Sequence, residues 1–127
     1  MEQTTIQRQH QNCKERPDCG KELNAIRDAI YVIGGKWRLP IIVTLRGGHT
    51  RFNDIQKTVG ISAKVLSTEL KSLELNGIVK RKVQHDSNTI EYELTDYSRT
   101  LHDVLESLGS WGTQHKEKIR KEMRNGI

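Results

Sequence analysis

The spacing of apolar residues changes near Gly77, and this change restricts the fold of the 127-residue chain more than any other feature. Before Gly77 apolar residues recur three or four positions apart, which is typical of helices. In segment 78–84 they alternate loosely and in segment 89–95 cleanly, with turn residues between, which is typical of a β-hairpin. Helical spacing returns after residue 98. The sequence therefore predicts a mainly α protein with one small hairpin (α+β).

Glycines divide the helical part into separate segments, because glycine disfavours a helix interior and suits a left-handed cap. The predicted helices span about residues 21–32, 36–46, a short segment carrying Phe52, Ile55 and Val59, then about 62–76 and 98–121. Ser62 is a good N-cap residue. We expect a flexible arm over residues 1–18, one domain over 19–122 and a tail over 123–127.

The short third helix and the helix that starts at Ser62 are separated by two or three residues around Gly60. That spacing is typical of a helix-turn-helix, in which the second helix reads the DNA major groove. The hairpin that follows would be the wing. The order of elements therefore predicts a winged helix-turn-helix.

Leu66, Leu70 and Leu73 define the core face of the predicted recognition helix. At 100° per residue, the opposite face is polar and cationic. It carries Lys64, Val65, Thr68, Lys71 and Ser72. Lysine can neutralise phosphate or donate to guanine, hydroxyls can bond base edges, and valine can contact a thymine methyl. This face predicts DNA binding; the alternative is an ordinary exposed helix face.

The first strand of the hairpin is cationic, whereas the second is acidic. We expect Lys80 and Arg81 on the first strand to approach DNA, with the acidic edge facing away. The alternative is that Lys80 and Lys82 pair across the hairpin with Glu91 and Glu93, which contributes about 0.2–1 kcal/mol per pair.

Positive charge is concentrated in parts of the chain. The formal net charge is +5, from 21 Lys and Arg against 16 Asp and Glu. Segment 33–51 has four basic and no acidic residues, and segment 62–82 has five basic residues against two acids. This pattern fits double-stranded DNA as a partner; a mixed solvated surface is the alternative.

Several classes of protein are disfavoured. No apolar run approaches the ~18 residues of a membrane helix, the first twelve residues are polar, and the two cysteines are too few for a disulfide scaffold. We expect a soluble, cytoplasmic protein without a membrane role. The five histidines form no recognisable catalytic or metal constellation, so we expect no enzyme activity, cofactor or metal.

Several motifs together resemble the HxlR family of bacterial winged-helix transcriptional regulators. The similarity covers about residues 19–111, and its most specific part is Gly34-Gly35-Lys36-Trp37 followed by Arg51-Phe52-Asn53. It implies a homodimer on a pseudo-palindromic operator. The DNA-binding residues that the helical face and the resemblance together indicate are Arg51, Ser62, Ala63, Lys64, Val65, Ser67, Thr68, Lys71, Lys80 and Arg81. The wing tip lacks the proline that is common in this family.

The resemblance places the dimer interface on the first and last helices, and both carry apolar stripes that a lean domain would cover with another surface. The predicted interface residues are Leu23, Ile26, Ile30, Leu101, Val104, Leu105, Leu108 and Trp111. The alternative is that the last helix folds back onto its own domain.

Cys19 lies just before the first predicted helix, where the helix N-terminus favours a thiolate. Some members of the similar family use a cysteine here to sense oxidants or electrophiles, which leaves room for an oxidant or small-molecule effector. Cys13 is the candidate resolving partner, and simple packing of Cys19 is the alternative. The competing function is a winged-helix protein-interaction module that does not bind DNA.

Overall fold

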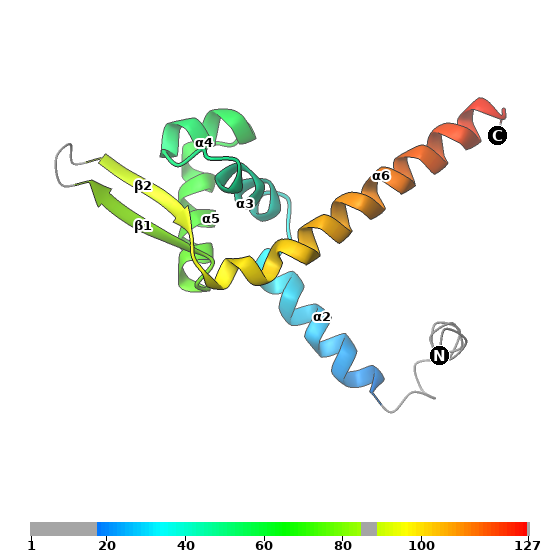
Figure 1. Ribbon diagram of the computed structural model, residues 1–127, viewed down its shortest axis with the longest axis horizontal. Coiled ribbons are helices and arrows are strands. Elements are labelled where there is room, and N and C mark those ends of the chain that lie inside the picture. The colour runs from blue at the N-terminus through cyan, green and yellow to red at the C-terminus, as the bar shows by residue number, and fades with distance from the viewer. Residues whose placement is uncertain (1–17, 85–88, 127) are drawn as a thin grey trace.

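Five α-helices and an antiparallel hairpin make up the part of the chain that the computed structural model describes, residues 18–84 and 89–126 (Figure 1). The elements are α2 (Cys19–Ile33), α3 (Arg38–Arg46), α4 (Phe52–Val59), α5 (Ala63–Leu75), β1 (Val79–Gln84), β2 (Thr89–Leu94), the 3-10 helix η2 (Tyr97–Leu101) and α6 (His102–Arg124). The predicted winged helix-turn-helix, mainly helical with one hairpin, is thus confirmed.

The core lies where α3, α4 and α5 meet the base of the hairpin. The side chains that are almost fully buried are Ile41 and Ile42 of α3, Ile55 of α4, and Leu66, Leu70 and Leu73 of α5. α3 contributes Ile41, Ile42 and Leu45 to this cluster, whereas Val43 on its outer side is 46% exposed. In Figure 1, α2 and the distal part of α6 project away from the cluster.

The turn between α4 and α5 has the features that the sequence predicts. Gly60 caps α4 with a φ of 76°, a left-handed conformation that favours glycine. The Ser62 side chain then accepts a hydrogen bond from the Val65 amide at 3.2 Å. This N-cap satisfies one of the free amides at the start of α5 and fixes where the helix begins.

The hairpin pairs Val79 with Leu94 and Gln84 with Thr89, in continuous antiparallel register. A short extension that the sequence did not predict joins its other edge. Arg51 forms an isolated antiparallel bridge with Glu91, and the Tyr92 amide donates to the Thr50 carbonyl at 2.8 Å. The residue just before α4 is therefore fixed to the wing.

The last helix begins later than the sequence predicts. Instead of a continuous α-helix from Ser98, the chain forms η2 and becomes α-helical only at His102. The Ser98 hydroxyl donates to the Thr95 carbonyl at 2.6 Å, and the Ser98 amide donates to the Thr95 hydroxyl. Such local side-chain bonds compete with regular α-helical bonding and favour a tight turn. α6 then continues to Arg124.

Arg38 connects three helices. Its Nε lies 2.8 Å from a carboxylate oxygen of Glu69 on α5, and its Nη1 donates to the Val32 carbonyl at the end of α2. Both charged side chains are largely buried. A cation at the C-terminal end of α2 also interacts favourably with the helix dipole.

We predict that Leu70→Ala lowers the free energy of unfolding by about 2–5 kcal/mol, because it removes a side chain that is 1% exposed from the core. Leu75→Ala is the matched control on the same helix, since Leu75 is 79% exposed, and its effect should stay below about 1 kcal/mol. Urea denaturation at one fixed protein concentration measures both. Equal losses of unfolding free energy in the two variants would contradict the conclusion that burial of Leu70 stabilises the position of α5.

Candidate nucleic-acid interface

The outer face of α5 is exposed as predicted. With Leu66, Leu70 and Leu73 buried, solvent reaches the predicted recognition residues Ser62, Ala63, Lys64, Val65, Ser67, Thr68 and Lys71. Ser72 differs from its expected outward position, because it is half-buried.

The two lysines on this face are available to bind an anion. Neither Lys64 nor Lys71 forms an ion pair with any residue in ranges 18–84 and 89–126. The Thr68 hydroxyl donates to the Lys64 carbonyl at 3.1 Å, in an exposed hydrogen bond within the helix. No acidic side chain projects from the same face, because Glu69 is directed to Arg38 and Glu74 to the hairpin.

Two of the three cations of β1, by contrast, are paired. Lys80 Nζ lies 3.3 Å from a Glu93 oxygen, and Arg81 Nε lies 3.3 Å from a Glu74 oxygen on α5. Cross-strand pairing is thus confirmed for Lys80. Lys82 lies opposite Glu91 in the register but forms no ion pair with it.

Glu91 is instead directed to Arg51, with 3.8 Å between Arg51 Nε and a Glu91 oxygen. Arg51, Lys80 and Arg81 are each more than half exposed. Exposed ion pairs contribute about 0–1 kcal/mol. A phosphate group could therefore replace these carboxylates at low cost.

Two cavities lie beside the helix-turn-helix. One of about 380 Å³ separates α5 from the hairpin and is lined by Ser67, Leu70, Lys71, Glu74, Leu75, Arg81 and Tyr92. The other, of about 630 Å³, lies between α4 and β2 and is lined by Arg51, Phe52, Asn53, Asp54, Lys57, Thr89 and Ile90. Both contain cations from the predicted set.

Sequence reasoning missed Asn53 and Lys57, which line the larger cavity together with Arg51. They lie four positions apart on α4 and so share one side of that helix. This four-residue spacing, together with Arg51 just before the helix, is the sequence signal that could have indicated a polar, cationic side of α4. The wing tip, residues 85–88, lies outside the described residues.

The predicted dimer residues fall into two groups. Leu23, Ile26 and Ile30 on α2 are exposed, as are Val104, Leu108 and Trp111 on α6. Leu101 and Leu105 instead pack against the core of their own domain. The alternative of a helix that folds back therefore holds for the start of α6 only. Ile119 and Met123 extend the exposed apolar surface beyond Trp111.

Cys19 is the first residue of α2 rather than the residue before it, and Asp18 occupies the N-cap position. Its side chain is buried and disulfide-bonded. Cys13, the other cysteine of the chain and the predicted resolving partner, lies outside the described residues.

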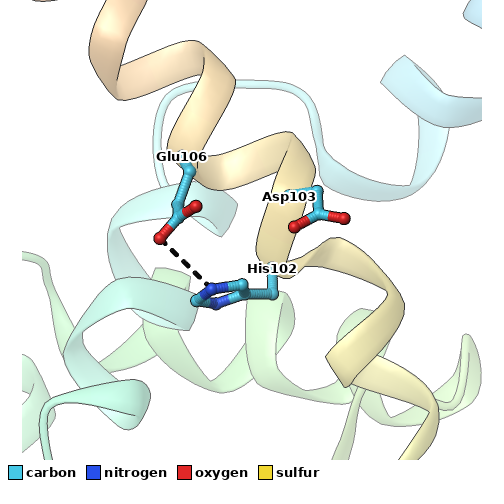
Figure 2. A group of neighbouring side chains, drawn as sticks. All are labelled: His102, Asp103 and Glu106. Atoms are coloured by element: carbon cyan, nitrogen blue, oxygen red, sulfur yellow. Dashed lines mark ion pairs between the residues drawn. The ribbon is translucent and has the colours of Figure 1, made fainter.

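Figure 2 shows His102, Asp103 and Glu106 at the start of α6, with the His102 ring directed at Glu106. These three side chains are close enough to share an ion and are all exposed. His102 Nε2 lies 3.2 Å from a Glu106 oxygen, so an ordinary i, i+4 ion pair accounts for their approach.

Among the helices that the structure describes, none combines the length and the apolar character that a membrane span requires.

Comparison with known proteins agrees with this geometry. The family profile described as HxlR-like helix-turn-helix matches residues 32–120. The HTH-type transcriptional regulator YybR of Bacillus subtilis (strain 168) is 31% identical over 109 residues, which cover 84% of this chain and 87% of YybR.

Two solved structures are similar in fold. The redox regulator HypR in its reduced form superposes with a TM-score of 0.70 at 30% identity, covering 76% of this chain and 98% of HypR. The reduced form of the transcriptional regulator YodB from B. subtilis gives a TM-score of 0.65 at 34% identity, covering 71% of this chain and 90% of YodB.

Proposed function

This chain belongs to the HxlR-like helix-turn-helix family of transcriptional regulators and is not an enzyme, and from that premise we propose that it binds a pseudo-palindromic DNA operator as a homodimer in the cytoplasm. The observation that carries the proposal is the outer face of α5. Its lysines are unpaired within the described part of the chain and its acids are directed elsewhere. Such a face suits the negatively charged major groove.

Each part of the interface has its own role in this proposal. The first turns of α5 enter the major groove, where Lys64 and Thr68 reach base edges and Val65 meets a thymine methyl. Lys71, on the cavity between α5 and the hairpin, and Arg81 bind phosphates. The remaining cations, Arg51, Lys57 and Lys80, exchange water or carboxylate partners for backbone phosphates.

The apolar stripes of α2 and α6 support the homodimer. Leu108 and Trp111 are large apolar side chains that stay exposed on a helix projecting from the domain. A surface of this kind is covered most simply by the same surface of a second copy around a two-fold axis. Two recognition helices related in this way would read half-sites about one helical turn apart, which explains the expected symmetry of the operator.

The disulfide of Cys19 supports a redox response. Cys19 is the first residue of α2. The similar solved structures include the redox regulator HypR and diamide-treated YodB from B. subtilis. Disulfide formation would remove two electrons and two protons from two thiols and transfer them to an oxidant such as diamide. We propose that this change alters operator binding.

We predict that Lys64→Ala and Thr68→Ala each weaken operator binding by about 1–3 kcal/mol, because each removes a contact to a base edge. The duplex is selected from a random pool by the wild-type protein, and fluorescence anisotropy measures the affinity. Binding should fall with salt, with a log–log slope of about −0.9 per phosphate neutralised. Lys121→Ala, an exposed lysine near the distal end of α6, should bind like wild type.

Two results would contradict the DNA proposal. If no duplex shows salt-dependent retention, the alternative of a winged-helix protein-interaction module is favoured. The ion-paired hairpin cations and the acidic second strand are the features that support that alternative. If both variants bind like wild type, Lys64 and Thr68 do not contact the bases.

We predict that Leu108→Asp converts a dimer into a monomer at micromolar concentration, because it buries a charge in the proposed interface. Sedimentation equilibrium should give the wild type about twice the 14.6 kDa chain mass. Ser110→Asp introduces the same charge on another face of α6 and should leave the dimer intact. A Leu108→Asp dimer would place the interface elsewhere.

We predict that diamide changes the operator affinity of the dithiothreitol-reduced protein by about fivefold or more, the usual scale of coupling between two sites. Cys19→Ser should bind the operator with the same affinity before and after diamide, because it cannot form the disulfide. An equal response in this variant, or no response in wild type, would leave Cys19 as a packing residue.

A further inference from the structure

We propose that the cavity between α3, β2, η2 and the start of α6 binds a small apolar carboxylate. The cavity has a volume of about 410 Å³ and is lined by Ile42, Arg46, Leu94, Ser98, Arg99, His102 and Leu105. Small-molecule sites typically measure about 300–1,000 Å³ and combine an apolar lining with a few convergent polar groups. This cavity has a volume in that range, and its lining contains both apolar and polar side chains.

The apolar part of the cavity is continuous with the core. Ile42 is almost fully buried, and Leu94 and Leu105 pack against the same cluster. These positions are held by the fold, so the apolar surface exists before a ligand arrives. An apolar group placed there would displace water from apolar side chains that cannot form hydrogen bonds with it. That displacement favours binding.

The polar part of the cavity is cationic. Three basic side chains and the Ser98 hydroxyl line it, and no carboxylate does. Arg99 pairs with Asp96 at 3.7 Å in a highly exposed contact, and His102 pairs with Glu106 at 3.2 Å (Figure 2). Both acids lie outside the lining, so the cavity presents more positive than negative groups.

Arg46 is the anchor that we assign to the ligand. It forms no ion pair with any residue of the described ranges, although it lies on the cavity. A guanidinium matches a carboxylate through two parallel hydrogen bonds, which are stronger than bonds between neutral groups. An apolar body of one or two rings would then lie on Ile42, Leu94 and Leu105. The expected ligand class is therefore a free organic monocarboxylate.

The position of the cavity implies a consequence for regulation, and this step rests on the proposed DNA-binding function. Its walls come from α3 and β2 of the winged helix and from η2 and α6, which lead to the proposed dimer stripe. A ligand that contacts both parts would alter how α6 is seated on the domain. It would thereby change the spacing of two recognition helices in a dimer.

Isothermal titration calorimetry of the full chain tests the site directly. The probe is phenylpropionate, and its uncharged amide, phenylpropionamide, is the matched control ligand. We expect phenylpropionate to bind with a Kd below about 1 mM and the amide to bind about tenfold more weakly, because it lacks the charge that pairs with Arg46.

Arg46→Gln should weaken phenylpropionate binding about tenfold, whereas Arg124→Gln, an exposed arginine at the far end of α6, should not change it. Circular dichroism confirms that both variants fold. Equal affinities for acid and amide, an unchanged Arg46→Gln affinity, or no binding at about 1 mM probe would overturn the proposal. Calorimetry reports this site whether or not the protein binds DNA, so its failure is distinguishable from failure of the proposed function.

Discussion

The burial of Leu66, Leu70 and Leu73 determines what the rest of this molecule presents to its surroundings. The three side chains are at most 1% exposed and pack among residues of α3, α4 and the hairpin. Because residues on a helix are 100° apart, fixing one face fixes the direction of every other side chain on α5. The capped start at Ser62 and the Arg38–Glu69 pair then limit sliding and rotation of the helix. The recognition face is therefore exposed because the opposite face is buried.

In the free protein, ion pairs with glutamates partly neutralise the cations of the wing. Both cations are on β1: Glu93 of the neighbouring strand pairs with Lys80, and Glu74 of α5 pairs with Arg81. Because these ion pairs are exposed, each is weak. Such a pair orders a long side chain but does not prevent a phosphate group from replacing the carboxylate. The lysines of α5 have no such partners among the described residues. The wing is thus partly neutralised in the free protein, whereas the helix keeps its full charge.

Local pattern predicted the elements, but tertiary contacts decided the details that the sequence left open. The leucine spacing, Gly60 and Ser62 are local signals, and the helix-turn-helix follows from them. The Arg51 bridge to Glu91 involves one residue on each side, so it produces no alternation that could be read from sequence. The late start of α6 depends on Thr95 and Ser98 bonding each other's groups, a competition between two local structures that periodicity cannot rank. Arg38 and Arg81 pair with residues of other elements, and sequence periodicity does not indicate such pairs.

The apolar residues near the start of α6 divide between two surfaces, the domain core and the exposed side of the helix, and the sequence pattern alone does not separate the two groups. Leu101 and Leu105 continue the apolar period into the core, whereas Val104 and Leu108, on the neighbouring side of the same helix, remain exposed. A single apolar stripe predicts burial but does not say against which surface. Here the first turn is fixed to the domain and the projecting turns are left for another surface. Anything that shifts the first turn must move the exposed residues beyond it, because an α-helix transmits rotation along its length as a nearly rigid element.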